Sequence, residues 1–159
     1  MLSPYSFRFA SADDLPRLRR WLSAPEVARW WGDPREQLEL LRADLNEPHM
    51  TMRIVSLRGR PFAYAQDYEV HAWPQAHLML LPRGARAINS FIGPPSMIGR
   101  RHGPAYLSLL AERLFAKGAP LVAIDPAIDN LRAGAPTKGQ AFASKRRSPP
   151  YRPGGSDDL

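Results

Sequence analysis

The chain has 159 residues, a formal net charge of +7 and no cysteine. This length predicts one domain with its own core, and the missing cysteines exclude disulfide frameworks, thiolate metal sites and cysteine nucleophiles. No stretch approaches the roughly 20 apolar residues of a membrane span, and the first residues lack the basic-then-apolar order of a signal peptide, so we expect a cytoplasmic protein without a membrane partner.

The first third of the chain has the pattern of one strand followed by three helices. Residues 5–10 alternate crudely between apolar and polar side chains, as in a strand. Capping boxes predict helix starts after Ser11 and Ser23. Asp33, which is followed by proline, predicts a third helix start.

The hydrophobic pattern then changes to a period of two, which indicates a β-hairpin. The two hairpin strands cover residues 51–57 and 61–68. The remaining expected elements are a long polar loop over 69–83, a strand over 85–92, an amphipathic helix over 103–117 and a short buried strand over 121–125. Strands and helices in this order predict a mixed α/β domain, here assigned to residues 1–133.

The composition changes at residue 134. Residues 134–159 contain four prolines and four glycines and show little apolar periodicity, so we expect neither helix nor strand but a disordered or aberrant tail. Five basic and two acidic residues give this tail a net charge of +3, which leaves 7 − 3 = +4 for the rest of the chain. Without an aromatic-rich basic motif, we expect no nucleic-acid partner.

Residues 97–115 begin as a glycine-bounded loop and continue as an amphipathic helix. The first backbone N–H groups of a helix have no intrahelical partner, and the helix dipole places partial positive charge there. Such a helix start is a ready anion site. The segment therefore predicts a phosphate-binding loop.

Four segments in order resemble the GCN5-related N-acetyltransferase (GNAT) superfamily: Trp30-Trp31-Gly32, Arg86 to Gly93, Met97 to Gly103 and Asp125 to Ala133. The resemblance covers about residues 5–133 and is closest to the branch of aminoglycoside 6′-N-acetyltransferases and siderophore-building acyltransferases. It implies an α/β (α+β) fold with a mixed, mainly antiparallel sheet, flanking helices and a splayed cleft for acetyl-CoA.

The resemblance also implies a reaction and a set of cofactor-binding residues. A substrate amine attacks the thioester of acetyl-CoA directly, without a metal. The residues expected to bind acetyl-CoA are Ser90, Phe91, Ile92, Ile98, Gly99, Arg100, Arg101, His102, Gly103, Pro104 and Asn130. Asn130 is also a good helix N-cap residue, and both roles can hold.

Two departures from the family pattern concern catalysis and phosphate binding. Relatives usually read G-I-D-Q-F-I-G where this chain has Asn89 in place of the aspartate, and an amide cannot accept a proton as a carboxylate does. Relatives also read G-[RK]-G-x-G-[ST] where this chain has Arg101 and Pro104. Arg101 adds a side chain where glycine permits close approach, and Pro104 removes one N–H donor. The sequence predicts a weakened phosphate site, partly compensated by the charges of Arg100 and Arg101.

Asn89 and Asp125 are the expected catalytic residues, and Trp31, Asp67 and Trp73 the expected acceptor-binding ones. For Trp30, Trp31 and Trp73, packing in the core is about as plausible as lining an acceptor pocket. Trp30 is the stronger candidate for the core and Trp31 the stronger candidate for the pocket. A turn or capping role is equally plausible for Asp67.

A polycationic aminoglycoside would need an acidic pocket. Such a pocket would form only if Asp67, Glu69 and Asp125 lie close together in the fold. His71 and His77 are spaced too loosely for a metal motif, so we expect no metal.

The family pattern continues past Asn130-Leu131-Arg132-Ala133 with a helix reading roughly R-A-Y-E-[KR]-A-G-F, which is missing here. Plausible codons for residues 134–142, read two bases later, encode R-A-Y-E-R-A-G-F. We therefore hypothesise a frameshift, in the gene or in its sequencing, that removed the last helix and strands. Their loss would expose a sheet edge and favour homo-oligomers. The two main functional hypotheses are an N-acetyltransferase acting on a small primary amine and an impaired relic that acts only as a cofactor-binding or interaction module. A third hypothesis, electrostatic binding of nucleic acid, would require residues 134–159.

Overall fold

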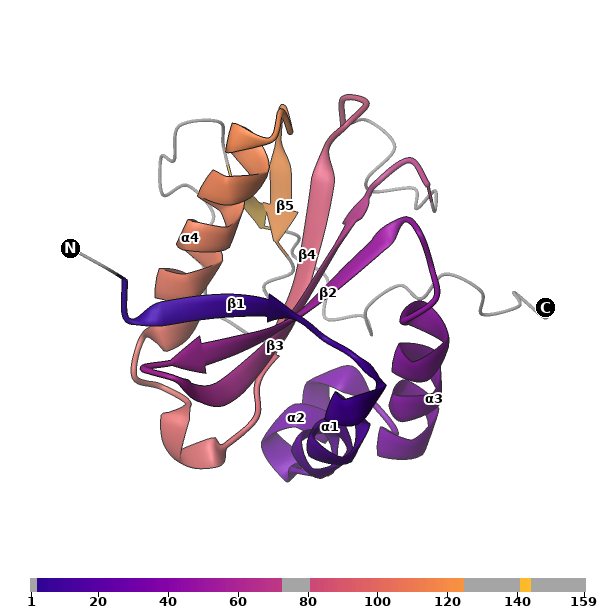
Figure 1. Cartoon of the computed structure of the whole chain (residues 1–159), viewed down its shortest axis with the longest axis vertical. Helices are drawn as coiled ribbons and strands as arrows, with labels where there is room; N and C mark the ends of the chain where they lie inside the picture. Colours follow the sequence, from indigo (N-terminus) through magenta and orange to yellow (C-terminus); the bar gives the residue numbers. More distant parts are fainter. Residues whose placement is uncertain (1–2, 73–80, 125–140, 144–159) are drawn as a thin grey trace.

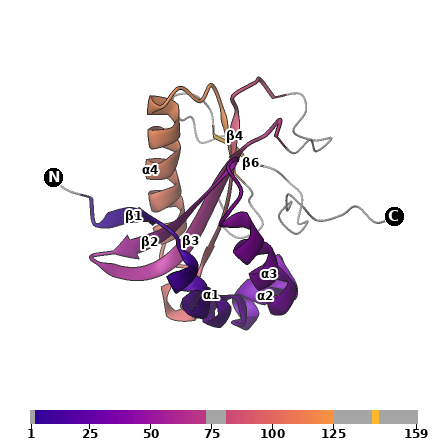
Figure 2. The same ribbon diagram turned by 45° about the vertical axis from the view of Figure 1, so that its right-hand side comes forward.

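A six-stranded sheet separates one long helix from three shorter ones. The computed structural model describes residues 3–72 and 81–124, and the backbone of residues 141–143. The strands are β1 (Tyr5–Phe9), β2 (Met50–Leu57), β3 (Arg60–Glu69), β4 (Arg86–Ile92), β5 (Val122–Ile124) and β6 (Ala141–Ala143). The helices are α1 (Leu15–Leu22), α2 (Pro25–Trp31), α3 (Pro34–Asp44) and α4 (His102–Ala116), with 3₁₀ turns at Ala12–Asp14 and Pro95–Met97. Helix α4 covers one face, and α1 to α3 lie against the other (Figures 1 and 2).

The strands lie side by side in chain order, from β1 to β6. Strands β1 to β4 are antiparallel, whereas β4 pairs with β5 in parallel after the crossover through α4. This arrangement confirms the expected mixed, mainly antiparallel sheet with flanking helices.

One expectation about the tail is wrong. Residues 134–159 were expected to contain no strand, yet Ala141–Ala143 forms β6, which pairs in parallel with β5. A three-residue apolar run needs only an available strand edge to pair, and the polar composition around it does not prevent this. Strand β6 thereby covers the outer edge of β5 in the described structure.

Alternating side chains of the central strands supply two cores. In β3, Tyr64 and Tyr68 belong to the core beneath α1 to α3, whereas Ala63 and Ala65 belong to the core beneath α4. Because successive strand residues point to opposite faces, one strand serves both layers. The same alternation decides which polar side chains can meet.

The helix starts show which capping signals operate. Asp33 caps α3 by accepting a hydrogen bond from the Glu36 N–H at 3.2 Å, as expected. The Ser11 capping box is also present, although it begins a 3₁₀ turn that precedes α1. The Ser23 prediction is wrong because Ala24 is the N-cap of α2. The proline that follows Ala24 favours an extended conformation there, and α2 therefore begins one residue later than expected.

Across residues 3–72 and 81–124, no helix is long and apolar enough to cross a bilayer.

The capping box of the 3₁₀ turn before α1 makes stability depend on pH. The Arg8 guanidinium holds the pKa of Asp14 below its ordinary value near 3.8, and the Ser11 N–H adds to this against the opposing effect of burial. Arg8 lies 2.6 and 2.8 Å from the two carboxylate oxygens. Because the folded-state pKa is the lower one, this stabilisation is complete above the unfolded-state pKa and is lost as the pH falls through the folded-state pKa.

We expect Asp14→Asn to lower the free energy of unfolding by about 1–2 kcal/mol at neutral pH. The difference from the unmodified protein should shrink in acid, as the pH falls through the lowered pKa of the native carboxylate. Urea unfolding at neutral pH and at an acidic pH measures this. Asp13→Asn, at the exposed neighbouring position, is the matched control with little expected effect. A difference that stays the same at both pH values would contradict the prediction.

Gly93, directly after β4, lets α1 pack against the end of that strand. A Cβ atom at this position would overlap the indole ring of Trp21, which belongs to the core beneath α1 to α3. We expect Gly93→Ala to lower the free energy of unfolding by about 1–3 kcal/mol, as overpacking does. Thermal or urea unfolding measures the loss.

The matched test is the same substitution in a Trp21→Phe background. A smaller ring leaves room for the added methyl group, so Gly93→Ala should cost less there. An equal cost in both backgrounds would show that the indole ring is not the obstacle.

Candidate active site

Strand β4 is paired with β5 along only part of its length. The parallel pairing ends at Ile88, which lies opposite Ile124, whereas β4 continues to Ile92. Residues 89–92 therefore have no β5 partner among the described residues. On its other edge this part of β4 remains paired with β3. An unpaired strand edge can bind an extended ligand through backbone hydrogen bonds.

Asn89 lies at the first position of this unpaired segment. It is opposite Gln66 in the register of β3 and β4, and alternation places it on the face that carries Phe91 and α1 to α3. The residue is 4% exposed, and its Nδ2 group has no hydrogen-bond partner in the described part of the chain. A buried donor without a partner costs about 1–3 kcal/mol, so a ligand oxygen at this point would be stabilising.

The next three side chains of β4 are held by the protein core. The Ser90 hydroxyl lies 2.7 Å from the Tyr64 carbonyl, to which it donates, and 2.5 Å from the Tyr106 hydroxyl on α4. Phe91 packs edge-on against Trp31, and Ile92 lies in the core beneath α4. A cofactor could therefore meet Ser90, Phe91 and Ile92 through their backbone, and these side chains serve packing.

The loop before α4 is open. Residues 98–101 are exposed, and a Cβ atom built on Gly99 would have no atom within 4 Å. Helix α4 begins at His102, one residue earlier than expected, and no side chain among the described residues caps it. The first backbone N–H groups of this helix are therefore available to an anion.

Arg101 and Pro104, the two departures from the family pattern, lie at the end of the loop and in the first turn of α4. Arg101 adopts the left-handed conformation, with φ +63°, that glycine adopts without strain. For another residue this conformation costs roughly 1–2 kcal/mol. Pro104 is the third residue of α4, where it fits the helix but donates no hydrogen bond.

The imidazole Nδ1 of His102 lies 2.7 Å from the Tyr5 hydroxyl of β1, which tethers this side chain to the sheet.

Trp31 is fully buried in the core beneath α1 to α3, where it packs edge-on against Tyr64 and Phe91. Trp30 is half-buried, and the Arg29 guanidinium lies over its ring. The expectation that Trp30 is the stronger core residue is therefore wrong. Trp31 follows the buried Val27 by four residues, so both lie on the same face of α2. Contact between Trp31 and an acceptor stays a prediction.

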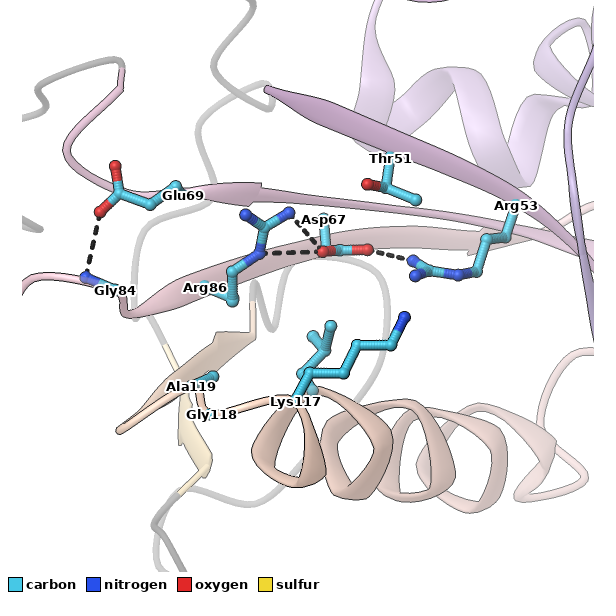
Figure 3. Close-up of a pocket in the computed structure, with 10 residues that line it drawn as sticks. Thr51, Arg53, Asp67, Glu69, Gly84, Arg86, Lys117, Gly118 and Ala119 are labelled. Carbon is cyan, nitrogen blue, oxygen red and sulfur yellow. Dashed lines mark hydrogen bonds and ion pairs between the residues drawn. The ribbon is translucent and has the colours of Figure 1, made fainter. Parts of the chain in front are cut away.

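Asp67 lies within β3, not at a turn, and is 1% exposed. One carboxylate oxygen accepts from Arg53, and the other accepts from Arg86 Nε at 3.0 Å and Nη2 at 2.6 Å (Figure 3). Asp67 faces α4, whereas Asn89 and Trp31 lie on the opposite face of the sheet. The structure therefore does not bring Asp67 together with these two predicted site residues.

A cavity of about 360 Å³ opens beside Asp67 at the C-terminal end of α4. Its lining residues are Thr51, Arg53, Asp67, Glu69, Gly84, Arg86, Leu114, Lys117, Gly118 and Ala119. Three cationic side chains outnumber the two carboxylates, so the acidic pocket that a polycation would need does not form here from Asp67 and Glu69. Sequence reasoning missed this cluster because its members are far apart in the chain and only the strand register brings them together.

The other predicted site residues, Trp73, Asp125 and Asn130, lie outside the described residues. Within the described ranges, no group of three or more His, Asp or Glu side chains is arranged to hold a metal ion.

Comparisons with known proteins agree with the observed fold. The family model described as "Acetyltransferase (GNAT) domain" matches residues 10–147, whereas no curated protein sequence matches the chain. The aminoglycoside acetyltransferase AAC(6')-Ib in complex with coenzyme A is 26% identical, with a TM-score of 0.68 over 80% of this chain and 77% of that one.

Two further solved structures share the fold. The aminoglycoside N(6')acetyltransferase from Legionella pneumophila is 22% identical, with a TM-score of 0.62 over 78% of this chain and 71% of that one. An uncharacterized protein from Bacillus halodurans is 23% identical with a TM-score of 0.65 over 72% of this chain, which spans 61% of that protein's length. Because the family model covers most of its residues, the chain belongs to the GNAT acetyltransferase domain family.

Proposed function

We propose that this protein is an acetyl-CoA-dependent N-acetyltransferase that acetylates a primary amine of a small molecule. The observation that carries the proposal is the segment of β4 from Asn89 to Ile92, which has no partner on its β5 edge among the described residues. This segment leads into an open loop and a helix start that no described side chain caps. A strand edge and a helix N-terminus together suit a ligand with an amide-containing arm and a phosphate group.

The described residues fit acetyl-CoA at both places. The backbone of residues 89–92 would pair with the pantetheine arm, and the N–H groups near Gly99 and Gly103 would bind the pyrophosphate. Arg100 and Arg101 flank these groups with positive charge. When bound, acetyl-CoA would supply the thioester that an amine attacks: a C–N bond would form, the C–S bond would break, and the leaving coenzyme A thiolate or solvent would take up the proton that the amine loses. A contact from Asn130 stays a prediction.

Asn89 would bind and orient the acceptor without removing a proton from it. Its amide can donate a hydrogen bond to an acceptor oxygen, but it is not a base at neutral pH. The protein would then acetylate the fraction of amine that is already neutral. A catalytic part for Asp125 also stays a prediction.

The acceptor is a small primary amine in this proposal, and aminoglycosides and siderophore precursors are its candidate classes. AAC(6')-Ib structures that contain kanamycin or ribostamycin favour an aminoglycoside. Asp67 does not contribute the negative charge that a polycation would need, because it lies across the sheet from Asn89 and is already bound by Arg53 and Arg86. Acetyl transfer is therefore better supported than any one acceptor.

The loop predicts opposite effects for two adjacent arginines. Arg101→Gly removes the strained left-handed arginine and lets phosphate approach the backbone, so it should raise the free energy of unfolding by about 1 kcal/mol and tighten acetyl-CoA binding several-fold. Arg100→Gly removes the same charge without relieving that strain, so it should weaken binding several-fold. Calorimetric titration and thermal unfolding measure both effects.

Weaker binding by both variants would mean that charge outweighs close approach in this loop. If the unmodified chain shows no saturable binding of acetyl-CoA, the proposed function is wrong.

Asn89→Asp should restore a base beside the acceptor. We expect a ten-fold or larger rise in kcat for an alkylamine, with little change in the affinity for acetyl-CoA. The activity of the variant should rise with pH as the new carboxyl group ionises, whereas the unmodified enzyme should follow the neutral fraction of the amine. Asn89→Leu, of similar size, is the control and should lose activity. Equal kcat values for the unmodified protein and the Asn89→Asp variant would remove this residue from the proton transfer.

A second candidate is an impaired relic that binds acetyl-CoA without turnover. The amide at Asn89, the strain at Arg101 and the missing N–H of Pro104 favour it. Titration with acetyl-CoA together with an assay of coenzyme A release distinguishes the two functions. The hypothesised frameshift belongs to this candidate: the nucleotide sequence must encode R-A-Y-E-R-A-G-F in the shifted frame, and the frame-restored chain should then regain activity.

A further inference from the structure

We propose that the cavity between β2, β3, β4 and the end of α4 is a binding site for a small organic anion that carries a carboxylate or phosphate group. It faces α4, whereas Asn89 lies on the opposite face of the sheet, so this ligand would not be the amine acceptor. The inference goes beyond the proposed acetyl transfer and does not depend on it.

The first observation is a shortage of negative charge around Asp67. Its single carboxylate binds both Arg53 and Arg86, so the three side chains together keep one positive charge. The Arg53 side chain is 10% exposed and that of Arg86 is 23% exposed. A guanidinium that is withdrawn from water and only partly neutralised favours a further anionic partner.

The second observation is that these guanidinium groups still have unused donors. In the described structure Arg53 donates to Asp67 through Nη1 alone, and Arg86 donates through Nε and Nη2. A guanidinium carries five N–H donors in a planar arrangement that matches the oxygens of a carboxylate or phosphate. Both side chains line the cavity, so a ligand there could reach the remaining donors.

Lys117 adds a third cation from the other wall. Figure 3 shows its side chain extending from the end of α4 toward Arg53. The carboxylate of Glu69 points away from these cations toward Gly84, and it accepts a hydrogen bond of 3.2 Å from the Gly84 N–H. The positive charge is therefore concentrated between Lys117, Arg53 and Arg86.

The C-terminal carbonyl groups of a helix carry partial negative charge and would repel an anion in the cavity. At the end of α4 the N–H groups of Lys117, Gly118 and Ala119 donate hydrogen bonds to the carbonyls of Arg113, Leu114 and Phe115. Because these carbonyls are already paired, α4 repels an anion less strongly than a helix end with free carbonyls would.

A volume of about 360 Å³ with apolar wall atoms from Leu114 and Ala119 leaves room for a carbon skeleton beside the charged group. This favours an organic acid or phosphate ester over a bare inorganic ion.

Calorimetric titration of the full chain with citrate tests the site, with inorganic phosphate as the probe for a bare oxyanion and glycerol as the uncharged control. We expect saturable citrate binding, weaker binding of phosphate and none of glycerol. Lys117→Gln should weaken citrate binding about tenfold, since one charge-assisted contact is lost. Arg42→Gln is the matched control because it removes one exposed positive charge on α3, across the sheet, and should leave binding unchanged.

Three results would overturn the proposal: no saturable citrate binding, equal citrate affinity in the unmodified and Lys117→Gln proteins, or an equal loss in Arg42→Gln. The same would follow if citrate and acetyl-CoA competed and Arg100→Gly weakened both, because the anion would then bind at the loop before α4. Unfolding curves of each variant confirm that the fold is retained. Acetyl-CoA titration of Lys117→Gln should match that of the unmodified protein, which separates this test from that of the proposed function.

Discussion

The structure depends on where β4 loses its pairing with β5. Up to Ile88 both edges of β4 are hydrogen-bonded, and beyond it the described chain pairs β4 only with β3. Among the described residues, the backbone groups on this edge of a central strand have no partner, which is costly unless a ligand or solvent satisfies them. The same constraint leaves the Asn89 amide buried without a partner in the described part of the chain. These features point to a ligand that pairs like a strand.

The loop before α4 combines an open backbone with two residues that would limit its proposed binding of phosphate. Gly99 remains open and α4 still begins without a side-chain cap. Arg101 keeps the left-handed backbone conformation that suits glycine, although its side chain makes this conformation costly. The backbone path is thus retained, while the donor set is reduced by Pro104. Binding and turnover therefore have to be measured separately.

Strand alternation divides the polar residues of β3 and β4 between two environments. Gln66 and Asn89 face α1 to α3, whereas Asp67 and Arg86 face α4. Residues adjacent in the chain therefore take part in different chemistry, one group beside the proposed acyl-transfer cleft and the other in a cationic cavity. A substitution at Asp67 would act first on Arg53 and Arg86, and on the acceptor only indirectly.

The sequence by itself determined the types of most elements, the loop that precedes α4 and the start of α3, because these rest on local periodicity and on capping within a few residues. It also placed Asn89 in a strand through a short motif, whereas phosphate binding by the loop stays a prediction. Only the tertiary structure decided that Trp31 packs in the core, that Ala141–Ala143 adds a strand to β5, and that two arginines meet Asp67. Each of these outcomes depends on partners 14 or more residues away, brought together by strand register and helix packing, which local patterns do not encode.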